Sequence, residues 1–313
     1  MNCTLNKIVN LYKPTGPSSF NMVRSVKKIL GVKKAGHIGT LDPLAEGVLP
    51  ICLNRSTRII QFLASQEKVY KAGMELGTST DTQDSTGKPL DTADASKITE
   101  EDILSVFKDF LGEIQQVPPM YSAKKKNGIP LYKLARNGIT IDRKPVTLWV
   151  HSLDFIKKEG NRVHFEVRCS PGTYVRTLCH DIGEKLGCRA HMFRLVRTRV
   201  GVFDVESSIT LDALKTAKEE NNLSGKLFHP GKALDFLPAV RVKKEHIQSI
   251  AHGIALSKSS LETLPSQFKP GMLFRVSNED HPVAAIVEPV IDQSTFAQLE
   301  PGDTVFKLKR VLI

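Results

Sequence analysis

Residues 36–50 read GHIGTLDPLAEGVLP, a loop rich in glycine and proline that contains the small acid Asp42. Gly36 and Gly39 permit backbone conformations and close approaches that other residues rarely adopt, and Pro43 fixes the backbone after Asp42. An aspartate before a proline commonly begins a turn, so one interpretation of Asp42 is purely structural. The other is that the loop holds its carboxylate in place for chemistry.

The segments around this loop predict alternating strands and helices. Ser18 or Ser19 can cap a helix that ends at Gly31, because the apolar residues between them share one face. Strands are predicted at residues 7–12, 48–53, 69–76, 147–155, 163–169 and 194–199. Further helices are predicted at residues 57–63, 99–111 and 175–186.

A domain boundary is predicted near residues 221–231, where Asn-Asn, Ser-Gly and Pro-Gly pairs cluster. The remainder predicts one short helix at residues 244–252 and brief strands at 272–276, 283–287 and 304–307. Short strands separated by Pro-Gly turns favour a small β-barrel.

The charge of the chain indicates a polyanionic partner. The 313 residues include 44 Lys and Arg against 33 Asp and Glu, a formal net charge of +11. Residues 117–145 carry seven basic residues and one acid, and residues 168–199 carry seven basic and two acidic. These two segments account for the whole excess. A solvated face is the usual explanation of one charge run, but two such runs favour a nucleic-acid track.

The cysteines and the apolar runs suggest a cytoplasmic protein. Five cysteines, Cys3, Cys52, Cys169, Cys179 and Cys188, show no C-x-x-C spacing, so we expect them to be reduced and mostly structural. We expect no signal peptide, and no apolar run approaches the ~18 residues that span a bilayer. The chain lacks the G-x-x-x-x-G-K-[ST], G-x-G-x-x-G and H-E-x-x-H motifs. We therefore expect no nucleotide cofactor and no metal site.

Residues 36–50 resemble the signature loop of the bacterial tRNA pseudouridine synthases, which act on uridine 55 in the T-loop. In that resemblance Asp42 matches the catalytic aspartate. Arg176, within GTYVRTL, matches the arginine that pairs with it. The other residues matched to substrate binding are His37, which would fill the space left by the flipped base, Lys13, Tyr70, Tyr174 and Leu195. Residues 80–84, TDTQD, resemble a loop beside the active site of that family.

The resemblance also implies an architecture. We expect an α/β protein of the α+β type, with a mixed, largely antiparallel sheet in a catalytic domain at residues 1–228 and the active site in its central cleft. An RNA-gripping insertion is expected at about 117–145, neither a clean strand nor an ordinary helix. A small C-terminal β-barrel would form an RNA-binding domain at residues 229–313, like that of pseudouridine synthases and archaeosine transglycosylases. Residues expected to contact the RNA backbone are Lys124, Lys125, Lys126, Lys133 and Arg136. The expected partner is the T-stem-loop of tRNA, and the expected state is a monomer.

Two other functions are compatible with the same residues. A base glycosylase would also use an acid, a flipped base and a basic track. A non-catalytic tRNA-binding protein or folding chaperone would leave the acid idle. For the isomerase itself, Asp42 could attack the sugar at C1′, attack uracil at C6 or remove the 2′ proton, and the sequence does not choose among these routes.

Overall fold

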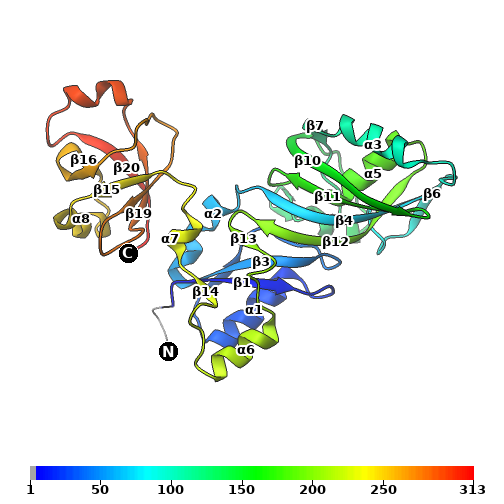
Figure 1. Ribbon diagram of the computed structural model, residues 1–313, viewed down its shortest axis with the longest axis horizontal. Coiled ribbons are helices and arrows are strands. Elements are labelled where there is room, and N and C mark those ends of the chain that lie inside the picture. The colour runs from blue at the N-terminus through cyan, green and yellow to red at the C-terminus, as the bar shows by residue number, and fades with distance from the viewer. Residues whose placement is uncertain (1–4) are drawn as a thin grey trace.

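The computed structural model describes residues 5–313, so Cys3 and the first residues of the N-terminal segment lie outside the described part of the chain (Figure 1). Two sheets dominate the structure. Figure 1 shows the larger sheet running across the molecule and the smaller sheet at the end that carries the C-terminus. Among residues 5–313, no helix combines the length and apolar character needed to cross a membrane.

The larger sheet has ten strands and is antiparallel at every pairing except that between β3 and β12. Its main path runs, in spatial order, through β14 (Leu227–Phe228), β1 (Ile8–Lys13), β3 (Glu46–Leu53), β12 (Ala190–Val200), β4 (Lys68–Leu76), β11 (Arg162–Cys169), β10 (Val146–Glu159) and β7 (Gly112–Gln116). Beside this path, β2 (Ala35–His37) pairs with β3, and β13 (Phe203–Asp204) pairs with β12. The predicted mixed, largely antiparallel sheet is confirmed.

The helices that cover this sheet begin and end at residues that favour such ends. The hydroxyl of Ser18 accepts a hydrogen bond from the Asn21 amide to cap α1 (Ser19–Leu30), and Gly31 closes that helix with a φ of 63°. Thr99 and Asp102 form a capping box at α3 (Glu100–Asp109). The other helical segments of this part are η1 (Asn54–Ile59), α2 (Ile60–Leu63), α4 (Leu131–Arg136), α5 (Val175–Lys185) and α6 (Leu211–Glu219).

The C-terminal part contains a six-stranded, barrel-like sheet, as predicted. In spatial order its strands are β16 (Leu256–Ser257), β20 (Thr304–Val311), β19 (Ala285–Pro289), β18 (Phe274–Ser277), β15 (Ala239–Val242) and β17 (Leu261–Thr263). Its helical segments are η2 (Lys244–His246), α8 (Ile247–Ala251), η3 (Lys258–Ser260) and η4 (Gln293–Gln298). The hydrophobic core of this part contains an aromatic cluster that includes Phe268, Phe274 and Phe306.

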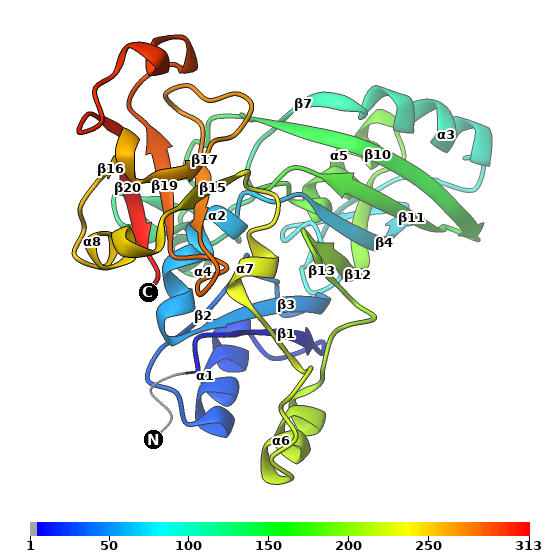
Figure 2. The ribbon, with the colours of Figure 1, turned by 60° about the vertical axis from the view of Figure 1, so that its left-hand side comes forward.

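The connection between the two parts packs against the larger sheet. Strand β14 pairs with β1, and α7 (Pro230–Ala233) follows it (Figure 2). Ala233, Leu234 and Leu237 share a buried cluster with Ile8, Ile38 and Val48 of the first part and with Val283 and Ile286 of the second. The two parts therefore share apolar core where the chain passes between them.

The insertion at residues 117–145 contains regular structure that its sequence did not predict. A hairpin of β8 (Lys125–Lys126) and β9 (Ile129–Pro130) is followed by the short helix α4. Backbone hydrogen bonds from the Leu131 amide to the Lys124 carbonyl and from the Tyr132 amide to the Ser122 carbonyl stabilise this arrangement. A separate small hairpin, β5 (Thr78–Thr80) with β6 (Pro89–Thr92), frames the polar segment after β4.

Candidate active site

Residues 36–37 belong to β2 and residues 46–50 to β3, and residues 38–45 form the loop between these two strands at the centre of the larger sheet. Lys13, at the end of β1, is fully buried beneath it, and its Nζ donates to the carbonyls of Pro43 at 3.3 Å and Ala45 at 2.6 Å. The hydroxyl of Ser19 lies 2.9 Å from both the amide and the carbonyl oxygen of Leu41. These bonds fix the backbone on both sides of Asp42.

Asp42 shares one guanidinium with a second carboxylate. Nη2 of Arg176, in the first turn of α5, lies 3.3 Å from Oδ2 of Asp42, and Nη1 lies 3.7 Å from Oδ2 of Asp84. The same Nη2 donates to the Tyr121 carbonyl at 2.6 Å. Arg176 is almost fully buried, whereas the Asp42 side chain is 35% exposed. The arrangement holds one accessible carboxylate beside a buried cation.

The polar loop after β4 orients Asp84. Its Oδ1 accepts from the Thr82 hydroxyl at 2.8 Å and the Thr86 amide at 3.0 Å. The Gln83 carbonyl in turn accepts from the Met192 amide of β12 at 3.0 Å. Asp84 is thus anchored by its own loop, which is attached to the central strand.

Burial and charge act in opposite directions on the acid. Partial burial raises the pKa of Asp42 above its ordinary value, and Arg176 and Lys13 oppose that rise while Asp84 adds to it. Burial also lowers the pKa of Lys13 to about 8 and that of Lys68 to about 8. The pKa of the Tyr70 phenol is raised by burial.

A cleft of about 280 Å³ opens above Asp42 and has mostly apolar walls. Tyr70 of β4, Leu195 and Met192 of β12, and Val175 of α5 line it. Tyr174 borders the same cleft. Its amide donates to Oε1 of the buried Gln116 at 2.8 Å, and its carbonyl accepts from Nε2 of Gln116 at 3.1 Å. A planar apolar ring with polar edges is the kind of group that such walls accept.

Most of the chain matches known proteins. A family model described as TruB family pseudouridylate synthase (N terminal domain) matches residues 27–175, and one described as tRNA pseudouridylate synthase B C-terminal domain matches residues 176–234. A tRNA pseudouridine synthase B of Pelotomaculum thermopropionicum is 43% identical over 281 residues, covering 88% of this chain and 89% of the relative. The chain belongs to the TruB family of pseudouridylate synthases. The resemblance carried by residues 36–50 is therefore confirmed.

Other relatives of this TruB family member extend the likeness over most of the chain. A tRNA pseudouridine synthase B of Clostridium tetani is 41% identical over 276 residues, covering 88% of this chain and 93% of the relative. Among solved structures, a chain of a Cbf5-Nop10-Gar1 complex is 30% identical with a TM-score of 0.79, covering 98% of this chain and 85% of that one. A chain of an H/ACA RNP bound to a substrate RNA containing 2′-deoxyuridine is 29% identical with a TM-score of 0.77, with coverage of 98% and 85%.

The structure of this TruB family member brings most of the predicted site residues to one cleft. Asp42, Tyr70, Tyr174, Arg176 and Leu195 all line it. Lys13 does not, because it lies beneath the loop with its ammonium group bonded to backbone carbonyls. His37 ends β2 opposite Ile51, and burial and the charge of Arg197 lower its pKa.

The predicted RNA-backbone residues lie on the insertion and face solvent. Lys124, Lys125, Lys126, Lys133 and Arg136 are all exposed. Arg136 stacks 5.6 Å from the ring centre of Tyr132. Ser122 and Ala123, at the base of the insertion, line the cleft. The insertion therefore connects a basic, exposed surface directly to the cleft.

Three buried polar residues were missed by the sequence analysis. They are Gln116, which holds Tyr174, and two cations that line the cleft, Lys68 and Arg197. Nζ of Lys68 donates to the carbonyls of Ala64 at 3.0 Å and Gln66 at 2.6 Å. Arg197 lies in the strand predicted at residues 194–199, in which a charged residue is expected to face solvent. Lys68 directly precedes the strand predicted at residues 69–76, and Gln116 lies where no element is predicted. No signal in the local sequence distinguishes them.

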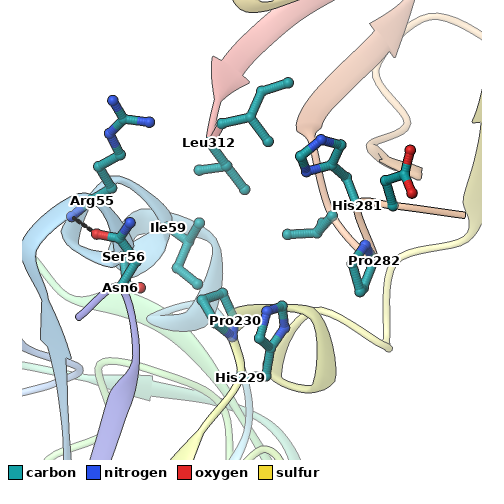
Figure 3. Close-up of a pocket in the computed structure, with 12 residues that line it drawn as sticks. Asn6, Arg55, Ser56, Ile59, His229, Pro230, His281, Pro282 and Leu312 are labelled. Carbon is teal, nitrogen blue, oxygen red and sulfur yellow. Dashed lines mark hydrogen bonds between the residues drawn. The ribbon is translucent and has the colours of Figure 1, made fainter. Parts of the chain in front are cut away.

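A second pocket, of about 400 Å³, lies where the two parts of the chain meet (Figure 3). Its walls come from η1, α7, the segment before β19 and the end of the chain, and they include Ile59, Pro230 and Leu312. None of the predicted site residues lies in this pocket. Among residues 5–313, no group of three or more His, Cys, Asp or Glu side chains is placed to hold a metal ion.

Proposed function

We propose that this chain converts uridine 55 in the T-loop of tRNA to pseudouridine, with Asp42 as the group that acts on the reacting nucleotide. The observation that supports this most directly is the 3.3 Å contact between Asp42 and the buried guanidinium of Arg176 at the floor of an apolar cleft. The cation opposes the effect of burial and favours the ionised carboxylate, the form that can act as nucleophile or base.

The reaction is an isomerisation, so its atoms balance without a second substrate. The bond between C1′ and N1 of uracil breaks, a bond between C1′ and C5 forms, and the proton on C5 is replaced by one on N1. Neither redox chemistry nor an energy source is required. Asp42 can take part by attack at C1′, by attack at C6 or by removal of the 2′ proton.

The cleft supports a specific placement of the base. The uridine is stacked within a folded loop, so it must be flipped out at a cost of a few kcal/mol. In this proposal the Tyr70 ring stacks on the uracil, Tyr174 and Leu195 enclose it, and His37 fills the space that it leaves. Lys13 acts indirectly, since its bonds to Pro43 and Ala45 hold the loop that carries Asp42.

The remaining parts of the chain are assigned to tRNA binding. We propose a catalytic domain at residues 1–228, an insertion at 117–145 whose lysines contact the T-arm backbone, and an RNA-binding domain at 229–313. We further propose a cytoplasmic monomer.

The test is conversion of unmodified tRNA by the purified protein and by Asp42→Asn. We expect the wild-type protein to yield a nucleoside of unchanged mass at position 55, with release of the hydrogen on C5. Asp42→Asn should bind tRNA within about tenfold of wild type and lose at least ~10³-fold in single-turnover rate. An abasic site would instead indicate a glycosylase, and tRNA binding without product in the wild-type protein would indicate a binding protein or chaperone.

A further inference from the structure

Arg197, near the end of β12, is fully buried and lies against the loop that carries Asp42. Its Nε donates to the Val48 carbonyl at 2.8 Å, its Nη2 to the Gly39 carbonyl at 3.0 Å, and its Nη1 lies 3.5 Å from the Thr40 carbonyl. Gly39 and Thr40 precede Asp42, and Val48 follows it. One side chain thus holds both limbs of the loop.

A guanidinium is a costly group to bury for packing alone. Burial lowers the pKa of Arg197, and the group that opposes this effect is the Tyr70 phenol rather than a carboxylate. An apolar side chain of similar volume would fill the same space without this desolvation cost. The three carbonyls, by contrast, require several donors in a planar fork, which arginine supplies.

Two of the three glycines in residues 36–50, Gly39 and Gly47, lie against the same residue. At Gly47, where φ is +104°, a Cβ would clash with the carbonyl oxygen of Arg197. At Gly39, where φ is +73°, a Cβ would lie 3.3 Å from Nη1 of Arg197 and 3.4 Å from Cε of Lys68. Both glycines therefore allow the loop to close on Arg197.

Arg197 also belongs to the strand that forms a wall of the cleft. It lies opposite Tyr70 in the pairing of β12 with β4, and two residues from Leu195. Its backbone pairs with Gly47 in the parallel contact between β12 and β3. The side chain consequently joins the loop that carries the acid to the strands that carry the walls of the base pocket.

We propose that Arg197 is a positioning residue, which fixes the Asp42 carboxylate relative to the bound uracil by holding the carbonyls of Gly39, Thr40 and Val48. This inference rests on the proposed role of Asp42. Although Arg197 borders the cleft, none of its surface is exposed, so its replacement should lower the rate of the chemical step and leave tRNA affinity unchanged.

The test compares Arg197→Met with Arg197→Lys. Methionine is apolar and cannot donate to the carbonyls, so we expect a single-turnover rate at saturating tRNA at least ~100-fold below wild type, with tRNA affinity within about threefold. Lysine keeps the charge but cannot span both limbs of the loop, so Arg197→Lys should retain more activity and still lose about tenfold.

A matched control separates positioning from a general loss of stability. Val163→Ala removes buried volume from β11, away from the loop, and should lower Tm without lowering the rate at a temperature well below unfolding. Wild-type protein and Asp42→Asn are assayed beside these variants, so failure of the proposed function would be seen independently.

Two results would overturn the proposal. One is a folded Arg197→Met protein with a rate within threefold of wild type. The other is a rate loss in Val163→Ala equal to that in Arg197→Met at the same drop in Tm. If Arg197→Met does not fold, the proposal is tested by Arg197→Lys. A wild-type rate in that variant would overturn the proposal, because it would show that the planar set of guanidinium donors is not needed.

Discussion

Burial raises the pKa of Asp42 above its ordinary value, and the charge of Arg176 opposes part of that rise. If the ionised form acts in the reaction, the single-turnover rate should fall as pH falls, with its inflection above the ~3.9 of a free aspartate. Arg176→Gln should move that inflection to higher pH, because the cation that lowers the pKa of Asp42 is gone. Rates measured from pH 4 to pH 8 at saturating tRNA check this. An inflection at the ordinary value, unchanged in Arg176→Gln, would contradict it.

The same shift has a consequence for stability. An acid whose pKa is higher in the folded than in the unfolded state contributes stability at pH values below its unfolded pKa, and this contribution is lost as pH rises through the folded pKa. Asp42→Asn removes the cost of ionising a partly buried carboxylate. Its Tm should therefore equal or exceed that of wild type at pH 7.5, and the difference should narrow toward pH 4. Thermal unfolding at the two pH values decides, and a lower Tm at pH 7.5 would show that the ion pair stabilises the fold on balance.

Residues of the candidate site that lie in contiguous sequence motifs could be predicted. Residues that reach the site only through the packing of distant segments could not. Asp42, Tyr70 and Arg176 lie within sequence patterns, and all three line the cleft. Arg197 lies in the strand predicted at residues 194–199, where a charged residue is expected to face solvent, and its burial depends on the loop that closes over it. Lys13 was matched through the family resemblance, but its burial beneath the loop depends on tertiary structure.

The insertion can be tested as an element. Neutralising Lys124, Lys125, Lys126 and Lys133 together should weaken tRNA binding and reduce the log-log salt slope by up to ~0.9 for each phosphate that the lysines neutralise. The matched control neutralises four exposed lysines outside the insertion: Lys97, Lys108, Lys215 and Lys226. Binding measured between 50 and 300 mM salt compares the two sets. Equal slopes in both variants and wild type would show that the insertion lysines form a solvated surface and do not contact phosphates.

Short elements were the hardest to predict from sequence. Helices α1 and α3 have capping residues and an apolar face, and both were predicted. The hairpin β8–β9 and helix α4 of the insertion were not, because their stability depends on backbone bonds to Ser122 and Lys124 rather than on an apolar period. A two-residue strand is too short to show the alternation of apolar and polar residues from which strands are predicted.

At the scale of the whole molecule, the shared apolar cluster suggests where the chain can be divided. A chain ending at Pro238 keeps β14, α7 and Leu237, and loses Val283 and Ile286 from the cluster. We expect it to fold with a lower Tm, to keep its single-turnover rate at saturating tRNA, and to show a raised KM, because binding energy remote from the reaction has been removed.

The control for this division is a chain ending at Asn222. It loses the pairing of β14 with β1 and also Ala233 and Leu234, so it exposes Ile8 and Val48 and should be less stable than the longer form. Circular dichroism melting and steady-state kinetics compare the two. Equal Tm values would show that the connection adds no stability, and an unchanged KM for the chain ending at Pro238 would assign the C-terminal sheet no part in binding tRNA.

The Tyr121 carbonyl, at the base of the insertion, accepts from the same Nη2 of Arg176 that lies beside Asp42. One nitrogen thus links the base of the insertion to the acid. If the insertion contacts the RNA as proposed, displacement of Tyr121 by the bound RNA would leave this nitrogen to Asp42 alone, and would so change the environment of the carboxylate. An incorrect RNA that enters the cleft without displacing the insertion would then be rejected by slow turnover rather than by weak binding, which is a form of selection exercised after the complex has formed.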